Sequence, residues 1–259
     1  FFFIHYEPWE KVMIPSSSSS AWNDCISAMS PLPKEMFRTP GNDASTIHAA
    51  EQRLNIQFSD NVKSMLQHCS GANLPLPLCG KMHPLVCLWS VEYWQDVVDS
   101  DMKETMDFIL EDKEKNRRII IGNNPFGADY GQVVLLRIPS SHHSAAVATV
   151  ELVTMNIPEF TEFESLESWI RSSPTLSFDE YIQEWNNYLL DDGVLDDDTL
   201  EQQQKQTEII SFVNKAVRKY CQWTGDTCAE AAWTRHSKEW EATVVPAMLN
   251  SLSNTKDSI

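Results

Sequence analysis

The chain has 259 residues, with 20 Lys or Arg against 37 Asp or Glu, and a formal net charge of −17. Such a surface repels phosphate backbones and anionic lipid headgroups, so we expect neither nucleic acid nor a membrane surface as a partner. No apolar run approaches the ~20 residues that span a bilayer. The six cysteines lack the spacing of a secreted disulfide scaffold. These features predict a soluble cytoplasmic protein, with the nucleus as an alternative.

Composition divides the chain into three parts. Residues 1–42 are expected to be an N-terminal tail, because the serine run at 16–20 is too polar and too simple to build a core. Residues 43–190 carry the periodic apolar patterns of one domain. Residues 191–259 open with five aspartates in "DDGVLDDD" and are expected to form an acidic linker and a helical extension. The first residue is Phe rather than Met, so a missing upstream segment remains an open alternative.

The central part begins with a predicted pair of helices. Helical apolar spacing runs from Asp43, a suitable N-cap, to Leu54. A second helix is expected to start at Ser59 and to keep the same spacing as far as Cys69, with Gly71 as its C-terminal stop.

The next stretch contains breakers and one further helix candidate. Residues 74–87 hold three prolines, which exclude a regular helix, so we expect a loop with at most one short strand. Ser90 is a candidate N-cap for a following helix, and residues 102–110 continue with helical spacing. The inner face of the helix after Ser90 would hold Val91, Trp94, Val97 and Val98.

Strands are then predicted at 119–121, 133–138 and 147–153, where β-branched residues lie between turn formers. Helices are expected at 163–172 and at 177–190, the second of which begins with a capping box. Two more helices should follow over residues 199–222 and 226–250. The first of these two needs a cover for the apolar face formed by Ile209, Phe212, Val213, Ala216, Val217 and Tyr220.

The glycine-rich segment 122–131 has the spacing of a phosphate-binding loop but not its chemistry. Gly122 and Gly127 match the two glycines of G-x-x-x-x-G-K-S/T, yet Ala128 and Asp129 occupy the positions of the lysine and the hydroxyl. A carboxylate there repels phosphate, and a strand follows instead of a helix whose N-terminus would face the anion. Gly, Asn and Pro instead favour a turn between two strands.

Metal and catalytic motifs are weak throughout the sequence. His68, Cys69, Cys79, His83 and Cys87 fall within twenty residues, but they contain no C-x-x-C pair, which favours buried free thiols over a zinc site. No G-x-S-x-G elbow and no HExxH sequence occurs. We therefore predict no catalytic residue, no metal ligand and no cofactor.

Four stretches occur in a recognisable order. They are "IHAAEQRLNIQFSDNVKSMLQHCSGANL" at 47–74, "LW" at 88–89, "IIIGNNPFGADYGQVVLLRI" at 119–138 and "LSFDEYIQEW" at 176–185. This order resembles the SMI1/KNR4-like domain, also called the SUKH superfamily, over about residues 43–190. The resemblance implies an α+β fold with a single mixed β-sheet and helices packed around it. The positions that match the family motifs are Gly71, Trp89, Gly122, Gly127 and Asp129.

The resemblance implies a non-catalytic protein-binding scaffold or regulatory adaptor, of the kind that acts in cell-wall synthesis or signalling. The polyserine segment and the helical extension favour this role. One alternative is an immunity protein that neutralises a toxin, because an acidic surface can block a basic toxin. A second alternative is a metal- or nucleotide-binding enzyme. The identity of the partner, the binding face and the oligomeric state stay open.

Overall fold

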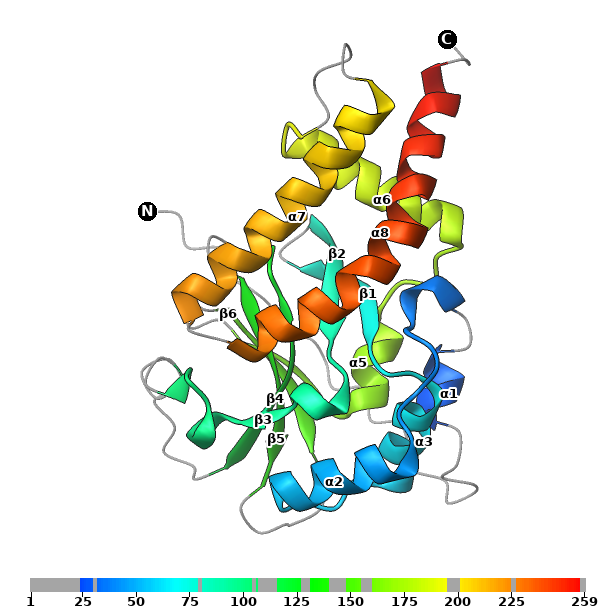
Figure 1. Cartoon of the computed structure of the whole chain (residues 1–259). Helices are drawn as coiled ribbons and strands as arrows, with labels where there is room; N and C mark the ends of the chain where they lie inside the picture. Colours follow the sequence, from blue (N-terminus) through cyan, green and yellow to red (C-terminus); the bar gives the residue numbers. More distant parts are fainter. Residues whose placement is uncertain are drawn as a thin grey trace, which may run out of the picture.

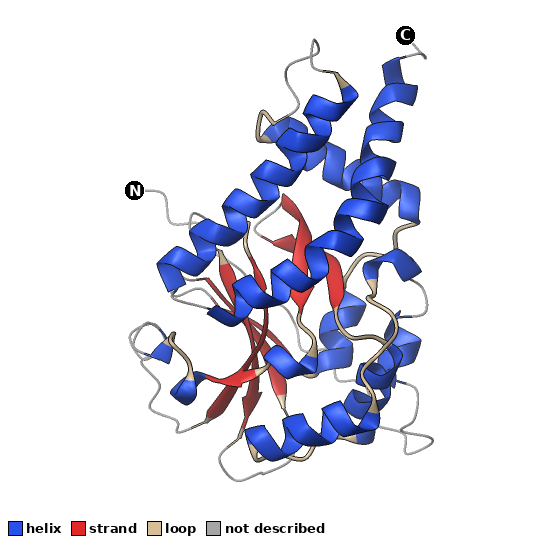
Figure 2. Ribbon diagram, viewed as in Figure 1, coloured by secondary structure: helices blue, strands red, loops and turns tan. Residues whose placement is uncertain are grey.

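A computed structural model describes residues 24–29, 32–78, 81–103, 106, 116–126, 131–139, 148–154, 160–194, 201–224 and 227–256. The fold is α+β: one sheet curls into a half-barrel, helices surround it, and the C-terminal part is helical (Figures 1 and 2). This confirms the predicted class and the predicted helical extension. All pairings between the described strands are antiparallel, so the sheet is not the mixed one that the resemblance implied.

The sheet has the strand order β1-β2-β4-β5-β6-β7, and β3 pairs with β4 beside this path. The strands predicted from β-branched residues are confirmed as β4, β5 and β6, and their aliphatic side chains are fully buried. The bounds are β1 Ala72–Leu78, β2 Lys81–Leu88, β3 Gln95–Asp96, β4 Arg117–Asn124, β5 Gln132–Ile138, β6 Thr149–Thr154 and β7 Phe160–Phe163.

The helices with strong local start signals are confirmed. Asp43 and Ser59 accept hydrogen bonds from Thr46 N and Val62 N as N-caps, and Ser177 with Glu180 completes the capping box. The α-helices are α1 Asp24–Met29, α2 Ala44–Leu54, α3 Asp60–His68, α5 Leu166–Ser172, α6 Phe178–Asp191, α7 Gln202–Thr224 and α8 Thr227–Lys256. The 3-10 helices are η1 Lys34–Met36, η2 Val91–Tyr93 and η3 Val97–Asp99.

The proline-rich segment is a hairpin of β1 and β2, so the expected loop was wrong. Arg38 N donates to Gly71 O (2.9 Å) on the outer edge of β1. By strand alternation the backbone nitrogens of Pro75 and Pro77 lie on this same edge, where no described strand needs an N–H group. Pro84 lies in β2 at a register shift, where a missing donor is again tolerated.

The helix expected after Ser90 is also absent: η2, β3 and η3 occupy residues 91–99. Ser90 Oγ donates to Asn42 Oδ1 (2.9 Å) instead of capping a helix. Val91, Trp94 and Val97 are buried as expected, but Val98 is 58% exposed, because the short β3 strand breaks the helical spacing. Most of the predicted helix 102–110 lies outside the described residues.

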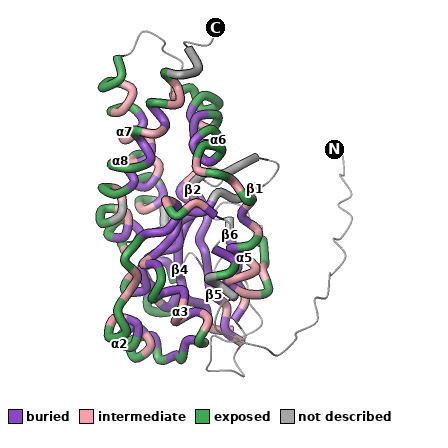
Figure 3. The backbone as a smooth tube through the Cα atoms, turned by 90° about the vertical axis from the view of Figure 1, so that its right-hand side faces the viewer, coloured by how far each residue is buried: buried purple, intermediate pink, exposed green. Residues whose placement is uncertain are grey.

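Helices α7 and α8 pack against each other and lie across one side of the sheet (Figure 1). They confirm the helices predicted at 199–222 and 226–250. Their inner residues, such as Val213 and Val245, belong to the same hydrophobic core as the sheet, and Figure 3 shows this buried face along both helices. None of the described helices combines the length and the apolar character needed to cross a bilayer.

The segment between α1 and α2, grouped with the tail in the sequence analysis, contributes to the core. α1 packs against α3 and α5, and Met29, Met36 and Phe37 are buried. An isolated bridge between Phe37 and Ala72 places this segment along the outer edge of β1. The segment thereby reaches the space between β1 and α8.

Candidate functional site

The glycine-rich segment joins β4 to β5, which pair antiparallel, and residues 125–126 form the described start of the predicted turn between them. Gly122 lies within β4 at an irregularity in its pairing with β5, and a Cβ atom there would collide with the carbonyl oxygen of Cys87. Glycine is therefore required at this position for close approach of β2 rather than for phosphate binding. Gly127 and Asp129 lie outside the described residues.

The described start of this turn is covered by the chain's own helices. The Phe126 ring lies 6.1 Å from Trp185 and 5.4 Å from Tyr188 on α6, and it stacks at 5.6 Å on Phe212 of α7. Aromatic pairs at such spacing stabilise a core. This part of the turn therefore anchors the C-terminal helices.

Cys69 and Cys87 are buried free thiols. Burial raises the pKa of each to about 11, although Arg38 acts in the opposite direction. Cys79 and the His83 side chain lie outside what the structure describes. Among the side chains it does describe, no three His, Cys, Asp or Glu residues form a group that could hold a metal ion.

Gly71 has a role that differs from the predicted helix stop. The C-cap of α3 is Cys69, and Gly71 has a φ of +147°. A Cβ atom on Gly71 would collide with the guanidinium group of Arg38. The residue is glycine because its φ is positive and because the Arg38 side chain and the Leu88 carbonyl oxygen occupy the adjacent space.

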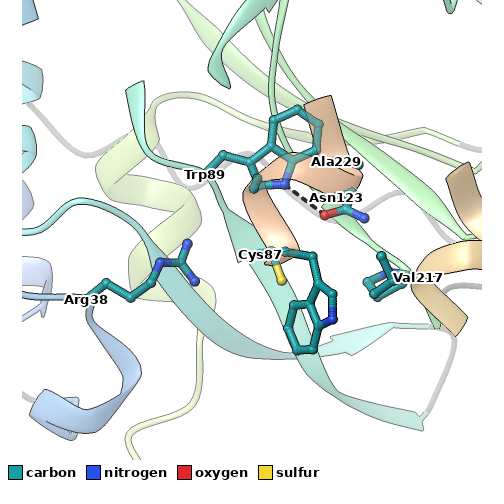
Figure 4. Close-up of a pocket in the computed structure, with 9 residues that line it drawn as sticks. Arg38, Cys87, Trp89, Asn123, Val217 and Ala229 are labelled. Atoms are coloured by element: carbon teal, nitrogen blue, oxygen red, sulfur yellow. Dashed lines mark hydrogen bonds between the residues drawn. The ribbon is translucent and has the colours of Figure 1, made fainter. Parts of the chain in front are cut away.

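Trp89 is buried and fixed by two hydrogen bonds. Its Nε1 donates to Asn123 Oδ1 (2.9 Å), and its carbonyl oxygen accepts from Trp94 Nε1 (3.0 Å). Gly71, Trp89 and Gly122 thus gather around the end of β2. Arg38 lies against Gly71, and Figure 4 shows Arg38 and Trp89 in the lining of one cavity. The structure brings these three motif positions together in structural roles.

Arg38 is held rigidly at this point. Its N–H donates to Gly71 O (2.9 Å), and its carbonyl oxygen accepts from Ser70 N (2.8 Å). Its Nη1 donates to Asn73 Oδ1 (2.9 Å), and its Nη2 donates to Leu88 O. Its Nε is buried and has no hydrogen-bond partner in the described part of the chain. The guanidinium group is therefore positioned by neutral acceptors and is not fully satisfied.

The charge of Arg38 has no close counter-ion among the described residues. The side chain is only 6% exposed, and no carboxylate of the described residues lies within 4.0 Å of it. Burial lowers the pKa of Arg38, while Cys87, Cys69 and Glu239 act in the opposite direction. Arginine does not lose its proton in proteins, so a positive charge remains in the interior at a cost in stability.

Two spaces adjoin Arg38. The first is a cavity of about 10 Å³, room for a single water molecule, between the sheet and the C-terminal helices (Figure 4). Its lining includes Arg38, Cys87, Trp89, Asn123, Val217 and Ala229. The second is an open groove of about 390 Å³ between the η1 segment, β1 and α8. Its lining includes Lys34, Phe37, Arg38, Asn73, Trp240 and Val244. Arg38 is shared by both, so the groove has a buried cation at its base.

Sequence reasoning missed Arg38 and the groove. Arg38 was placed in the tail, and its neighbours Leu88 and Glu239 are far away in the sequence. Only the glycine at position 71 carried a local signal, and it was read as a helix stop.

Comparisons with protein-family models, curated proteins and solved structures gave no match. The resemblance to the SMI1/KNR4-like domain therefore stays a prediction.

Proposed function

We propose that this chain is a non-catalytic protein-binding scaffold, and that the groove between η1 and α8 receives a segment of a partner protein. The observation that carries the proposal is the groove itself: about 390 Å³, with a buried cation at its base. Ligand sites in proteins are commonly clefts of roughly 300–1,000 Å³, and the groove falls in this range. The proposal agrees with the adaptor role that the family resemblance implies.

The groove walls belong to the packed core. Phe37, Trp240 and Val244 are buried on their inner sides, and Asn73 lies at the start of β1. A preformed site loses less conformational entropy when it binds than a site that must first become ordered. This rigidity favours recognition of a partner by the groove.

The rim of the groove supplies charges of both signs. Lys34 is exposed and lies 4.0 Å from the half-buried Glu35, and Glu239 is exposed on α8. An aromatic wall with a charged rim is common at sites where proteins bind one another.

The net charge of −17 favours a second candidate, neutralisation of a basic toxin by an acidic surface. Association would then be steered by long-range electrostatics, and its rate would fall steeply with added salt. Binding in the groove alone would show a weaker dependence on salt.

A site-specific photo-crosslinker tests the proposal. It is placed at Thr243, which is exposed in the groove, and in a matched variant at Ala49, which is exposed on α2 outside the groove. In an extract of the source cells we expect the Thr243 variant to crosslink a defined segment of one protein and the Ala49 variant to lack this product. The proposal fails if both positions give the same products or if Thr243 gives none.

A further inference from the structure

The base of the groove has the chemistry of an incomplete anion site. Arg38 presents a buried guanidinium group whose described partners are the neutral oxygens of Asn73 and Leu88, and its Nε has none. A buried charge held only by neutral groups is costly, and an anion would supply the missing counter-charge. Carboxylates match the guanidinium group in geometry and charge.

Asn73 adds a second donor at the same place. Because its Oδ1 accepts from Arg38 Nη1, the amide N–H groups of Asn73 point away from the guanidinium group. Both residues line the groove and both are more than nine-tenths buried. An anion that enters the groove would therefore meet the side chains of Arg38 and Asn73 together.

The rim limits which anions can enter. Glu35 and Glu239 line the groove and outnumber Lys34, the one cation described at its rim, and the whole chain carries a net charge of −17, so a multiply acidic segment is repelled. A ligand with one carboxylate and a neighbouring cation suits this arrangement better, because the cation can pair with the rim carboxylates. Phe37 and Trp240 can cover the aliphatic part of such a side chain.

We propose that the groove binds the C-terminal carboxylate of a partner protein, with Arg38 and Asn73 holding the carboxylate and Glu35 and Glu239 holding a Lys or Arg side chain beside it. A C-terminal Lys or Arg carries both groups on one residue, a carboxylate for Arg38 and a cation for the carboxylates that line the groove. This inference rests on the proposed function of the same groove.

The test uses the full-length protein labelled with ¹⁵N and titrated by NMR with small probes. Nα-acetyl-lysine carries the carboxylate and the cation, and Nα-acetyl-lysinamide lacks the carboxylate. We expect the acid to shift the amide signals of Asn73 and Thr243 and to bind at least ~10-fold more tightly than the amide, since hydrogen bonds to charged groups are strong. Equal binding of the two probes would overturn the inference.

Two variants and two further probes separate the parts of the site. Arg38→Met should abolish the preference for the acid. Glu239→Gln, a change at an exposed position that leaves the core intact, should reduce the preference for Nα-acetyl-lysine over Nα-acetyl-norleucine.

Nα-acetyl-glutamate α-amide presents a side-chain carboxylate, and inorganic phosphate presents a free anion. Tighter binding of either one than of Nα-acetyl-lysine would contradict the assignment to a chain terminus.

The outcome also separates the two proposals. A partner crosslinked at Thr243 without any preference for the acid would leave the scaffold role standing and remove the carboxylate site. Selective binding of the acid without a crosslinked protein would assign the groove to a small carboxylate and would remove the scaffold role.

Discussion

Two buried arginine sites in this molecule are built in opposite ways. On the sheet, Glu151 accepts from Arg118 (2.8 Å) and pairs with Arg137 (3.1 Å), which also reaches Glu162 (2.8 Å). At the groove, Arg38 has neutral oxygens and no carboxylate of the described residues within 4.0 Å. Among the residues that the structure describes, the first site has its counter-charges, whereas the second has none.

Strand register explains how the sheet cluster is satisfied. Arg118 lies directly opposite Arg137, and Glu151 lies directly opposite Glu162, so like charges face each other across the strands. Such like-charged pairs are unfavourable alone. However, Arg118 on β4 reaches past β5 to Glu151 on β6, and Arg137 on β5 reaches the same Glu151 diagonally. Because carboxylates of the chain neutralise Arg118 and Arg137, these arginines need no ligand. Arg38 has no such carboxylate among the described residues, which makes it the candidate for function.

The largest expected effect comes from breaking the complete site. Glu151→Gln leaves the buried Arg118 and the partly exposed Arg137 without their shared carboxylate, and we expect the free energy of unfolding to fall by about 3–5 kcal/mol. Urea denaturation measures this loss. The matched control is Glu162→Gln in the same cluster: its side chain is half exposed, and the change should cost at most ~1 kcal/mol. Equal losses in the free energy of unfolding of the two variants would show that burial of a carboxylate does not determine how much it stabilises the cluster.

The next effect tests whether Gly71 is needed to make room for Arg38. Gly71→Ala puts a Cβ atom against the guanidinium group and onto a backbone with φ +147°, so we expect a loss of about 2–3 kcal/mol in the free energy of unfolding. In an Arg38→Ala background the collision with the side chain is gone, and the loss should be smaller. Strictly additive losses would contradict this coupling.

The smallest effect at neutral pH concerns the thiols beside Arg38. Burial raises the pKa of Cys69 and Cys87 from about 9 to about 11, so the folded state keeps protons that the unfolded state releases. The free energy of unfolding should therefore fall as the pH rises from about 9 to about 11. Urea denaturation across this range measures the slope, and the Cys69→Ala/Cys87→Ala variant should show a smaller one.

The opposite result would change the comparison between the two arginine sites. The free energy of unfolding of the Cys69→Ala/Cys87→Ala variant could fall more steeply over this pH range than that of the unsubstituted chain. The thiols would then ionise more readily in the folded state than in the unfolded state. Arg38 would then have thiolates as its counter-ions.

Local signals in the sequence predicted the elements that depend on neighbouring residues. The caps at Asp43, Ser59 and Ser177 act within three residues, and the helices they begin are present. The β-branched runs of β4 and β5 likewise identify themselves, because any strand with such residues must be buried on both faces.

The errors arose where distant residues decide the structure. Prolines in β1 are compatible with a strand only because that strand is at the edge of the sheet, which its own sequence does not show. Arg38 is buried because β2 and α8, about 50 and about 200 residues later in the chain, close over it. The short segment before the first periodic helix has no regular apolar spacing and carries no local sign of such contacts.

The most direct test of the central claim measures stability and binding on one variant, Arg38→Met. If the charge is retained for recognition, the apolar side chain should leave the free energy of unfolding unchanged or raise it by up to about 2 kcal/mol, while the partner crosslinked from Thr243 is lost. A clear loss of stability with undiminished crosslinking would contradict the claim, because Arg38 would then be a structural residue.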